Sequence, residues 1–452
     1  MKKLIALLAV FGFVSYAHAG DGTEFSQSGD FRVQYQHDVD TNYDGTASSE
    51  SIHQRMRWGA NWRAGEKLSA HLKMVDNANW GENPDQVPAG RTSAPVTNTS
   101  GATTNVATVQ EAYGVWQASD SVTIKAGRSS LTLGDGRWIS ANDYENVNNA
   151  IDGVIVKWDQ EMFRVVVAGA RAAQASTVGT VTTGNNVARL WGADVAWKTA
   201  PDFLKTVSAH YALVRTDEGD YGPAAANPFP KEESVRYGVN VAGDKMGVDY
   251  RANYEMYTGK RTSTAVAPTT QDVAASMMDA EVGYSMPSLM GLRAHVLYHT
   301  DSGSKVATKD ETYQGFYYDR HENGGLMGLF SWGNLTYTSL GVSANPRDDI
   351  SVAVNYYMYG KTENADNNYT GAGKAVVNGY TNATTQFANG SNGASTDKAL
   401  GNELDVVVTK KYTNNFNINA HYSTFSPGAV LKTNTGHSET ASQIYLASTL
   451  TF

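Results

Sequence analysis

The chain has 452 residues, of which 36 are basic and 45 are acidic, and it contains no cysteine. The absence of cysteine excludes thiolate chemistry and the disulfide-stapled class of secreted domain. The net charge of −9 argues against nucleic-acid binding, which needs a basic surface. A mean hydropathy of −0.40 suits a soluble protein, and equally a transmembrane barrel whose strands alternate apolar and polar residues.

The N-terminus has the three parts of a secretory signal peptide. Lys2 and Lys3 precede the apolar run Leu4–Tyr16, and Ala17-His18-Ala19 is a cleavage signal of the A-x-A type. We therefore expect residues 1–19 to be removed and residues 20–452 to form one domain. Without the two lysines, 34 basic and 45 acidic residues remain, a net charge of −11. No later apolar run approaches the roughly 18 residues that a membrane-spanning helix needs.

After the signal peptide, the dominant pattern is alternation with a period of two residues. Met56 and Trp58 fall on one face of an extended segment, for example, while Arg55 and Arg57 fall on the other. The pattern predicts eighteen strands with cores near 25–37, 53–64, 68–77, 105–117, 122–131, 151–158, 162–171, 187–198, 205–215, 234–242, 247–257, 274–284, 292–300, 334–344, 350–360, 402–411, 416–425 and 442–452.

The connections between these strands alternate in length. Short turns such as Gly65–Lys67 and Tyr412–Asn415 alternate with long segments such as Asp301–Gly333 and Lys361–Gly401. Short turns on one side and long loops on the other are typical of outer-membrane barrels. The sequence therefore predicts an all-β fold, a transmembrane antiparallel β-barrel of about 18 strands with short periplasmic turns and long extracellular loops. The alternative, a soluble β-sandwich or β-helix, needs a second layer that no segment supplies.

The orientation of two neighbouring segments stays open. The pattern does not decide which face of Gln110–Gln117 points outward. Arg128 shares its face with Ile124 and Ala126, which would direct it at lipid. A β-bulge at Gly127 would reverse that direction, because a bulge adds one residue to the alternation.

The polar face of the strands would line the lumen of the barrel. Its basic residues are Arg32, Arg55, Arg57, Arg63, Lys73, Lys125, Arg164, Lys198, Arg236, Arg251 and Arg293. Its acidic residues are Asp194, Asp249, Glu255, Asp279, Glu281, Glu403 and Asp405. Arginine dominates the early strands and acid the late ones, so we expect a basic lumen that favours anions, with Glu403 and Asp405 neutralising part of it. The alternative is that these charges only keep the lumen wet.

The segment Leu131–Ala150 is a long polar connection with glycines at 134 and 136 and no helical period. It is too rich in Asn, Asp, Gly and Arg for a buried core. We expect it to fold into the barrel and narrow the pore, with Gly134, Asp135, Gly136 and Arg137 at the constriction. The alternative is a surface loop outside the membrane.

The first long loop contains one candidate metal site. Asp40, Asn42 and Asp44, followed by Gly45, match the start of a calcium-binding loop, since oxygen ligands at alternate positions suit Ca²⁺. The twelfth position is Ser51 instead of Glu, and Asp, Asn and Gly are also ordinary turn formers. A structural calcium ion is the one cofactor that the sequence suggests.

Several motifs resemble those of the alginate export porins, which are outer-membrane β-barrels. They are QEAYGVW (Gln110–Trp116), AGR (Ala126–Arg128), LGDGRW (Leu133–Trp138), IDGV (Ile151–Val154), His321 ahead of GLMGLFSWGNLT (Gly325–Thr336), ELDVVVT (Glu403–Thr409) and HYSTFSPG (His421–Gly428). The resemblance covers most of the mature chain and departs mainly in the loops. It implies a channel in the outer membrane of a Gram-negative bacterium.

We therefore expect a porin that passes small hydrophilic, mainly anionic solutes passively and contacts outer-membrane lipid. The alternatives are a dedicated exporter of an acidic polysaccharide such as alginate, and a structural or adhesive barrel plugged by its own loops. No spacing of residues favours catalysis, so we do not expect an enzyme. The pattern leaves open the solute, the direction of transport, the gating and the choice between monomer and trimer.

Overall fold

The computed structural model describes residues 23–40, 43, 45, 48–80, 106–144, 148–173, 187–216, 231–262, 270–305, 309–313, 315, 324–330, 332–364 and 397–452. The expected signal peptide, residues 1–19, and His321 lie outside these ranges. Within them, no helix is long and apolar enough to cross a bilayer.

The described residues form eighteen strands, as the alternation predicts. They are β1 (Thr23–Val39), β2 (Ser48–Ala64), β3 (Leu68–Asn79), β4 (Val106–Gln117), β5 (Val122–Ser129), β6 (Ile151–Asp159), β7 (Phe163–Ala173), β8 (Val187–Trp197), β9 (Thr206–Thr216), β10 (Lys231–Lys245), β11 (Val248–Thr262), β12 (Thr270–Met286), β13 (Leu292–Asp301), β14 (Leu335–Arg347), β15 (Ile350–Lys361), β16 (Ala399–Thr413), β17 (Phe416–Pro427) and β18 (Ala441–Thr451).

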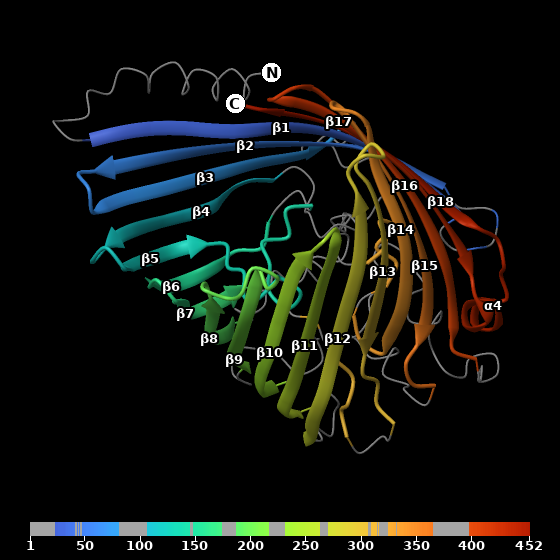
Figure 1. Ribbon diagram of the computed structural model, residues 1–452. Coiled ribbons are helices and arrows are strands. Elements are labelled where there is room, and N and C mark those ends of the chain that lie inside the picture. The colour runs from blue at the N-terminus through green and yellow to red at the C-terminus, as the bar shows by residue number, and fades with distance from the viewer. Residues whose placement is uncertain are drawn as a thin grey trace, which may run out of the picture.

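Each strand pairs antiparallel with its neighbours in the sequence, and β1 also pairs with β18, which closes the sheet. Figure 1 shows the strands following one another around the wall, from β1 in blue to β18 in red. A closed ring leaves no unpaired edge, which is the condition for a sheet to cross a bilayer. A barrel of this size encloses an interior wide enough for an aqueous channel.

Several strands extend beyond their expected cores on the side of the long loops. β11 continues to Thr262 and β12 begins at Thr270, several residues outside the expected segments 247–257 and 274–284. The alternation that identifies a strand depends on lipid at one face. Cross-strand hydrogen bonds continue beyond the lipid-facing part of the wall, toward the long loops, where the outer face is polar.

The apolar residues lie on the outside of the wall. Large side chains such as Trp116, Trp191, Tyr254 and Leu446 are exposed there, at 44–50 % of their surface. Buried polar and charged side chains lie on the opposite face. This distribution is the reverse of a soluble protein and fits a wall whose outer solvent is lipid.

The structure has no bulge at Gly127, where one would have turned Arg128 inward. The pairing of β4, β5 and β6 runs without a shift through Gly127, which lies opposite Tyr113 and Gly153. The bulge lies instead in β4, where Lys73 opposes Glu111 and the next pair is Met74 with Val109. Gln110 is therefore the extra residue.

The shift at Gln110 and the unbroken pairing at Gly127 decide the two orientations that the sequence left open. Both Gln110 and Glu111 are buried, whereas Trp116 is exposed on the outer face. Arg128 stays on the outer face, and its Nη1 lies 3.2 Å from Oδ2 of Asp152 on β6. Arg128 therefore does not point into the lumen, and the ion pair with Asp152 accommodates its charge on the outer face.

The loop between β17 and β18 contains a short helix, α4 (Ala429–Thr435), that the strand pattern left unassigned. Gly436 ends it with a φ of 74°, a conformation that glycine adopts without steric cost. Val430 and Leu431 of this helix are buried in an apolar cluster, and the helix packs against β16 and β17. The helix thus covers one end of this cluster inside the barrel.

The lipid-facing register can be tested with one arginine. Leu446 lies midway along β18 on the outer face. Leu446→Arg should lower the free energy of unfolding from lipid vesicles by about 2–4 kcal/mol, the cost of a cation near the midplane of such a wall. Thr449→Arg, on the inner face of the same strand, is the matched control and should cost much less. Equal losses for the two variants would contradict the assigned faces.

Candidate functional site

The segment between β5 and β6, residues 130–150, is called lumen loop 1 here. Its tip is a tight turn in which Gly134 and Gly136 have φ of 60° and 85°. The N–H of Leu133 donates to the carbonyl of Ile139 at 3.3 Å. A Cβ on Gly134 would lie 2.4 Å from Nδ2 of Asn240 on β10, so glycine is required both for the turn and for the approach to the wall.

An apolar patch fixes this loop to the wall formed by β6–β9. Leu133, Trp138 and Ile139 are almost fully buried. They pack with inward-facing residues of these strands, among them Ile155 and Leu190. The expectation that the segment is too polar to form a core is wrong. Four of its residues, Leu131, Leu133, Trp138 and Ile139, are apolar, and they pack on strands whose inner faces are also apolar.

Polar contacts hold the tip against β8, β11 and β12. The N–H of Gly134 donates to Oδ2 of Asp194 at 3.1 Å, and Nδ2 of Asn253 donates to Oδ1 of Asp135 at 2.7 Å. Arg137 forms ion pairs with Asp135 and, at 3.0 Å, with Asp279. The four residues expected at the constriction thus lie in one turn, and three of them contact the wall directly.

The distal part of lumen loop 1 contacts strands on the other side of the barrel. Carbonyl oxygens accept hydrogen bonds there: that of Tyr144 from Arg32 at 2.9 Å, and that of Asp143 from Arg55 at 3.1 Å. The Asp143 carboxylate pairs with Arg57, and the ring of Tyr144 stacks on that of Tyr445 at 6.0 Å. Because β8–β12 and β1–β2 lie far apart around the ring, the loop crosses the interior.

The two central arginines of β2 have carboxylate partners that the sequence did not indicate. Asp30 on β1 accepts from Arg55 at 3.1 Å and from Arg57 at 2.5 Å, and Asp143 supplies a second carboxylate. Asp30 shares its face with Arg32, two residues along, so alternation could have identified it. Asp143 lies in an irregular segment, and no periodic signal could have identified it.

The segment between β13 and β14, residues 302–334, is called lumen loop 2. Two acids of β16 hold its backbone: Asp405 accepts from the N–H of Leu326 at 3.1 Å, and Glu403 from that of Met327 at 2.9 Å. Both carboxylates are fully buried. They bind the backbone of this loop, and their neutralising part of the arginine charge stays a prediction.

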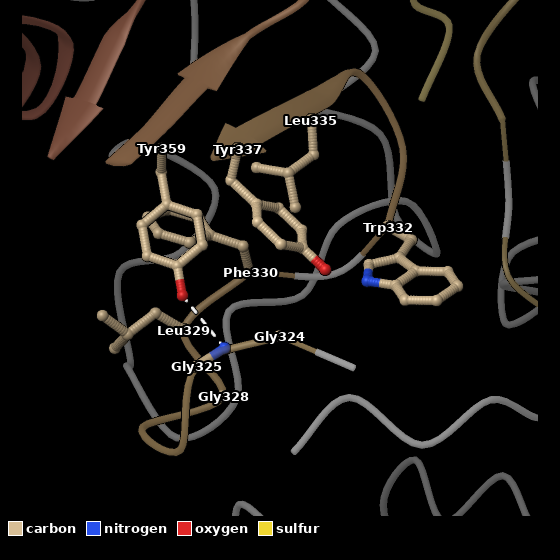
Figure 2. Close-up of a pocket in the computed structure, with 9 residues that line it drawn as sticks. All are labelled: Gly324, Gly325, Gly328, Leu329, Phe330, Trp332, Leu335, Tyr337 and Tyr359. Atoms are coloured by element: carbon tan, nitrogen blue, oxygen red, sulfur yellow. Dashed lines mark hydrogen bonds between the residues drawn. The ribbon is translucent and has the colours of Figure 1, made fainter. Parts of the chain in front are cut away.

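Aromatic rings surround the turn of lumen loop 2. Figure 2 shows a pocket between the glycines of this turn and the rings of Tyr337 and Tyr359, with the N–H of Gly325 donating to the Tyr359 hydroxyl at 3.0 Å. Phe330 packs on Tyr359 with ring centres 4.8 Å apart. The buried apolar cluster here extends over β11–β17 and fills that side of the interior.

A buried polar group lies between the two loops. His299 on β13 has ring nitrogens 3.3 Å from Asp279 and 3.2 Å from Asp301. Its ring lies 4.6 Å from those of Trp332 and Tyr337. Asp279 also binds Arg137 of lumen loop 1, and Trp332 of lumen loop 2 packs on His299, so Asp279 and His299 together connect the two loops. Neither His299 nor Asp301 was among the residues that the sequence singled out.

Other residues expected in the lumen form separate networks. On β11–β13, Arg251 binds Glu281 at 2.7 Å, while Arg293 binds Glu281 at 2.6 Å and Asp249 at 2.5 Å. Arg236 lies under lumen loop 1, 3.9 Å from the centre of the Tyr257 ring.

Glu255 accepts from the Tyr313 hydroxyl at 2.7 Å and has no contact with an arginine among the described interactions. On β3–β5, Lys73 lies 3.5 Å from Glu111, and Lys125 lies 4.5 Å from the centre of the Tyr113 ring.

Three of the cations expected in the lumen are exposed, near the end of the barrel that carries the short turns. Arg63 and Arg164 are exposed, and Arg63 lies 3.7 Å from Glu24. Lys198 pairs with Asp159 at 2.7 Å.

The expected calcium site is described only in part, because Asn42 and Asp44 lie outside the described residues. Asp40 is buried, and its Oδ1 accepts from the N–H of Gly45 at 2.5 Å. Its carbonyl accepts from the N–H of Tyr43 at 2.9 Å. These bonds are those of a tight turn. Among the residues described, no group of three His, Cys, Asp or Glu side chains suits a metal ion.

A family model described as alginate export matches residues 24–444, which span the whole barrel except its last residues. The chain belongs to the alginate export family. The resemblance inferred from the motifs is thereby confirmed, and with it an outer-membrane channel protein of Gram-negative bacteria.

Solved structures agree on the fold of this alginate export family member. Pseudomonas aeruginosa OpdL matches with a TM-score of 0.59 at 9 % identity, covering 95 % of this chain and 99 % of that one. OpdK of the same organism, solved with vanillate, matches with a TM-score of 0.58 at 10 % identity, covering 94 % and 98 %. OccK11 (OpdR) matches with a TM-score of 0.53 at 11 % identity, covering 95 % and 96 %. No curated protein matches the sequence.

The position of lumen loop 1 predicts a cross-link in this family member, which has no cysteine of its own. A Cβ on the inward-facing Gly192 would lie 3.0 Å from Cδ1 of Leu133. Leu133→Cys with Gly192→Cys should therefore form a disulfide on mild oxidation, detected by a reducible shift in gel mobility. The control is Leu133→Cys with Trp191→Cys on the outer face of β8, which should stay reduced. Cross-linking of the control alone would place the loop outside.

The contact between Asp143 and Arg57 predicts a pH dependence. Burial alone would raise the pKa of the Asp143 carboxyl, but its hydrogen bond to Arg57 and that residue's charge lower it to about 2. A lowered pKa stabilises the fold above the ordinary value of about 3.9 and loses that contribution as pH falls toward 2.

Asp143→Asn should therefore lower the free energy of unfolding at pH 6, by less than about 1 kcal/mol because the Asp143 side chain is 64 % exposed. The difference from the wild type should vanish near pH 2. In an Arg57→Gln background, the same substitution should have little effect at either pH. An equal loss at pH 6 and pH 2 in the parent would contradict the ion pair.

Proposed function

We propose that the lumen passes small hydrophilic solutes by diffusion, with a preference for anions, and that it catalyses no reaction. The observation that carries this proposal is the cluster of Arg32, Arg55 and Arg57 on the inner wall, next to the crossing of lumen loop 1. Three guanidinium groups gather there, and the carboxylates of Asp30 and Asp143 are among their partners. Guanidinium groups bind carboxylate and phosphate in a fixed fork geometry and keep their charge at neutral pH.

The charge is distributed unevenly around the inner wall. β3–β7 carry Lys73, Lys125 and Arg164, with Glu111 as the acid closest to Lys73. On β11–β13 the charges are more nearly balanced, because Arg251, Arg293 and Arg137 of lumen loop 1 share three carboxylates, those of Asp249, Asp279 and Glu281. This uneven distribution supports a lateral field across the path. Such a field orients a solute that carries both an anionic and a polar end.

The two loops favour small solutes over a polymer. Lumen loop 1 crosses from β8–β12 to β1–β2, and lumen loop 2 is held by Glu403 and Asp405. A polysaccharide exporter would need both sets of contacts to open for each chain. The family and the arginine cluster still support an acidic polysaccharide as the second candidate, since uronate carboxylates suit the same guanidinium groups.

Single-channel recording with ion substitution tests the proposal. The purified protein in a planar bilayer should conduct, and in a potassium chloride gradient its reversal potential should show preference for chloride. Arg55→Gln with Arg57→Gln should reduce the chloride to potassium permeability ratio by about twofold or more, because rings of positive side chains favour anions.

Lys205→Gln with Lys245→Gln is the matched control. Both lysines are exposed at the side of the short turns, so the ratio should not change. A wild-type channel that already prefers potassium at low salt, where lumen charge is least screened, would contradict the anionic preference. Passage of long oligouronates into vesicles at the rate of monomers would favour the exporter.

A further inference from the structure

Apolar side chains occupy four consecutive short turns at the periplasmic end of the barrel. These turns join β6 to β7, β8 to β9, β10 to β11, and β12 to β13. Their exposed apolar residues are Met162, Phe203, Met246, Leu289 and Met290, each with between 43 and 89 % of its surface accessible. Apolar side chains that gather on an exposed surface mark a contact with a membrane or another protein.

The short turns on the rest of the ring are polar. They consist of residues 65–67, 119–121, 348–349 and 414–415, and none of these residues has a large apolar side chain. Glu66, Asp120, Asp348 and Asn414 are exposed at their tips. The apolar turns are therefore a feature of one side of the barrel, from β6 to β13, and not a general property of its periplasmic end.

Two of the apolar turns place methionine where the backbone favours another residue. Met246 and Met290 have φ of 54° and 56°, and each precedes a glycine with positive φ, Gly247 at 85° and Gly291 at 64°. Side chains are sterically disfavoured in this left-handed region, and asparagine tolerates it best. Asn-Gly is the usual sequence of a two-residue hairpin turn such as the one at Met246. Methionine does not favour either turn, which points to a contact of its side chain outside the turn.

The apolar turns are continuous with the lipid-facing wall. Phe163 is the first residue of β7 and Val248 the first of β11, and both are exposed on the outer face. The hydroxyl of Tyr250, on the outer face of β11, donates to the carbonyl of Phe203 at 2.7 Å. A Cβ on Gly243 of β10 would lie 1.9 Å from that carbonyl oxygen, so glycine lets the turn lie against the wall. The apolar surface thus extends from the strands into the turns.

The arrangement of these turns suits a lipid surface better than a folded protein. Neighbouring turns are two strands apart, about 10 Å along the ring, and exposed polar residues such as Asp202 and Ser288 separate the apolar ones. A stable protein contact buries about 800 Å² on each partner in one patch. A curved line of single side chains can instead enter fluid lipid at every turn. Lys245, whose Nζ lies 5.8 Å from the centre of the Phe203 ring, can extend its charge to the headgroups.

We propose that the four turns between β6 and β13 are immersed in the inner leaflet of the outer membrane, where their exposed apolar residues contact lipid acyl chains. The polar turns on the rest of the ring lie in the periplasmic water. The boundary of the hydrocarbon is therefore beyond the turns on one side of the barrel and short of them on the other. This contact is independent of the lumen and of the solute that the channel passes.

Fluorescence quenching of single labels tests the proposal, because the chain has no cysteine of its own. A bimane label is attached at Met246→Cys or Met290→Cys and, as matched controls in polar turns, at Glu66→Cys or Asn414→Cys. The full-length protein is then inserted into phospholipid vesicles. Phospholipid that carries a nitroxide near the glycerol end of an acyl chain should quench the labels at the two methionine positions at least about twofold more than the control labels.

Iodide on both sides of the bilayer should show the opposite order, with the stronger quenching at the control positions. Equal iodide quenching at all four positions would overturn the proposal. Quenching of the methionine positions by iodide and not by the nitroxide lipid would also overturn it, because these turns would then lie in water, as a surface for a periplasmic protein.

The contribution of the two methionines can be measured without disturbing the turns. Met246→Asn with Met290→Asn introduces the residue that tolerates this backbone conformation, so the barrel should fold unchanged. Iodide quenching of a label at Leu289→Cys should then rise at least about twofold, because two apolar contacts with the leaflet are lost. Glu66→Gln in a polar turn is the matched control and should leave the quenching at Leu289→Cys unchanged. No rise in the asparagine variant would overturn the role assigned to the methionines.

Discussion

Inside a bilayer, every backbone N–H and C=O must find its partner within the protein, and this requirement organises the whole molecule. The pairing of β1 with β18 satisfies it, because that contact closes the eighteen sequential strands into a ring without edges. The reversed distribution of side chains follows directly. Apolar residues such as Trp191 and Leu446 face the lipid, and charged residues such as Arg55 and Glu403 can only be buried on the inner side.

A ring of this size is too wide for its own inner side chains to fill, and two of its loops fold into the interior. Lumen loop 1 depends on a region where the rule of apolar residues outside and polar residues inside does not hold. The inner faces of β6–β9 carry Ile155, Leu190 and Val214 there, where a water-filled pore would have polar groups. Trp138 and its neighbours bind there as in an ordinary hydrophobic core. Lumen loop 2 is held differently, by buried carboxylates that accept from its backbone N–H groups. The first loop thus depends on burial and the second on hydrogen bonds.

Ion pairs between inward-facing side chains reduce the net charge of the lumen. The inward cations alone would make the lumen strongly basic, but Arg55, Arg57, Arg251 and Arg293 each have a carboxylate oxygen within 3.1 Å. The electrostatic field in the lumen therefore depends on how the paired charges are distributed, with arginines gathered on β1 and β2 and carboxylates on β11 and β12.

The sequence by itself determined the number, order and facing of the strands, because lipid outside and water inside force a period of two on any such wall. It also located lumen loop 1 and most inward charges. Only the tertiary structure decided where the alternation is interrupted, at Gln110 and not at Gly127, since a bulge is defined by its partner strand. The partners of the charges were likewise invisible: Asp143 reaches Arg57 across 86 positions, and Glu403 reaches the backbone of Met327 across 76. Periodicity records which solvent a residue faces, whereas a contact through the lumen depends on how an irregular loop folds, and no period encodes that.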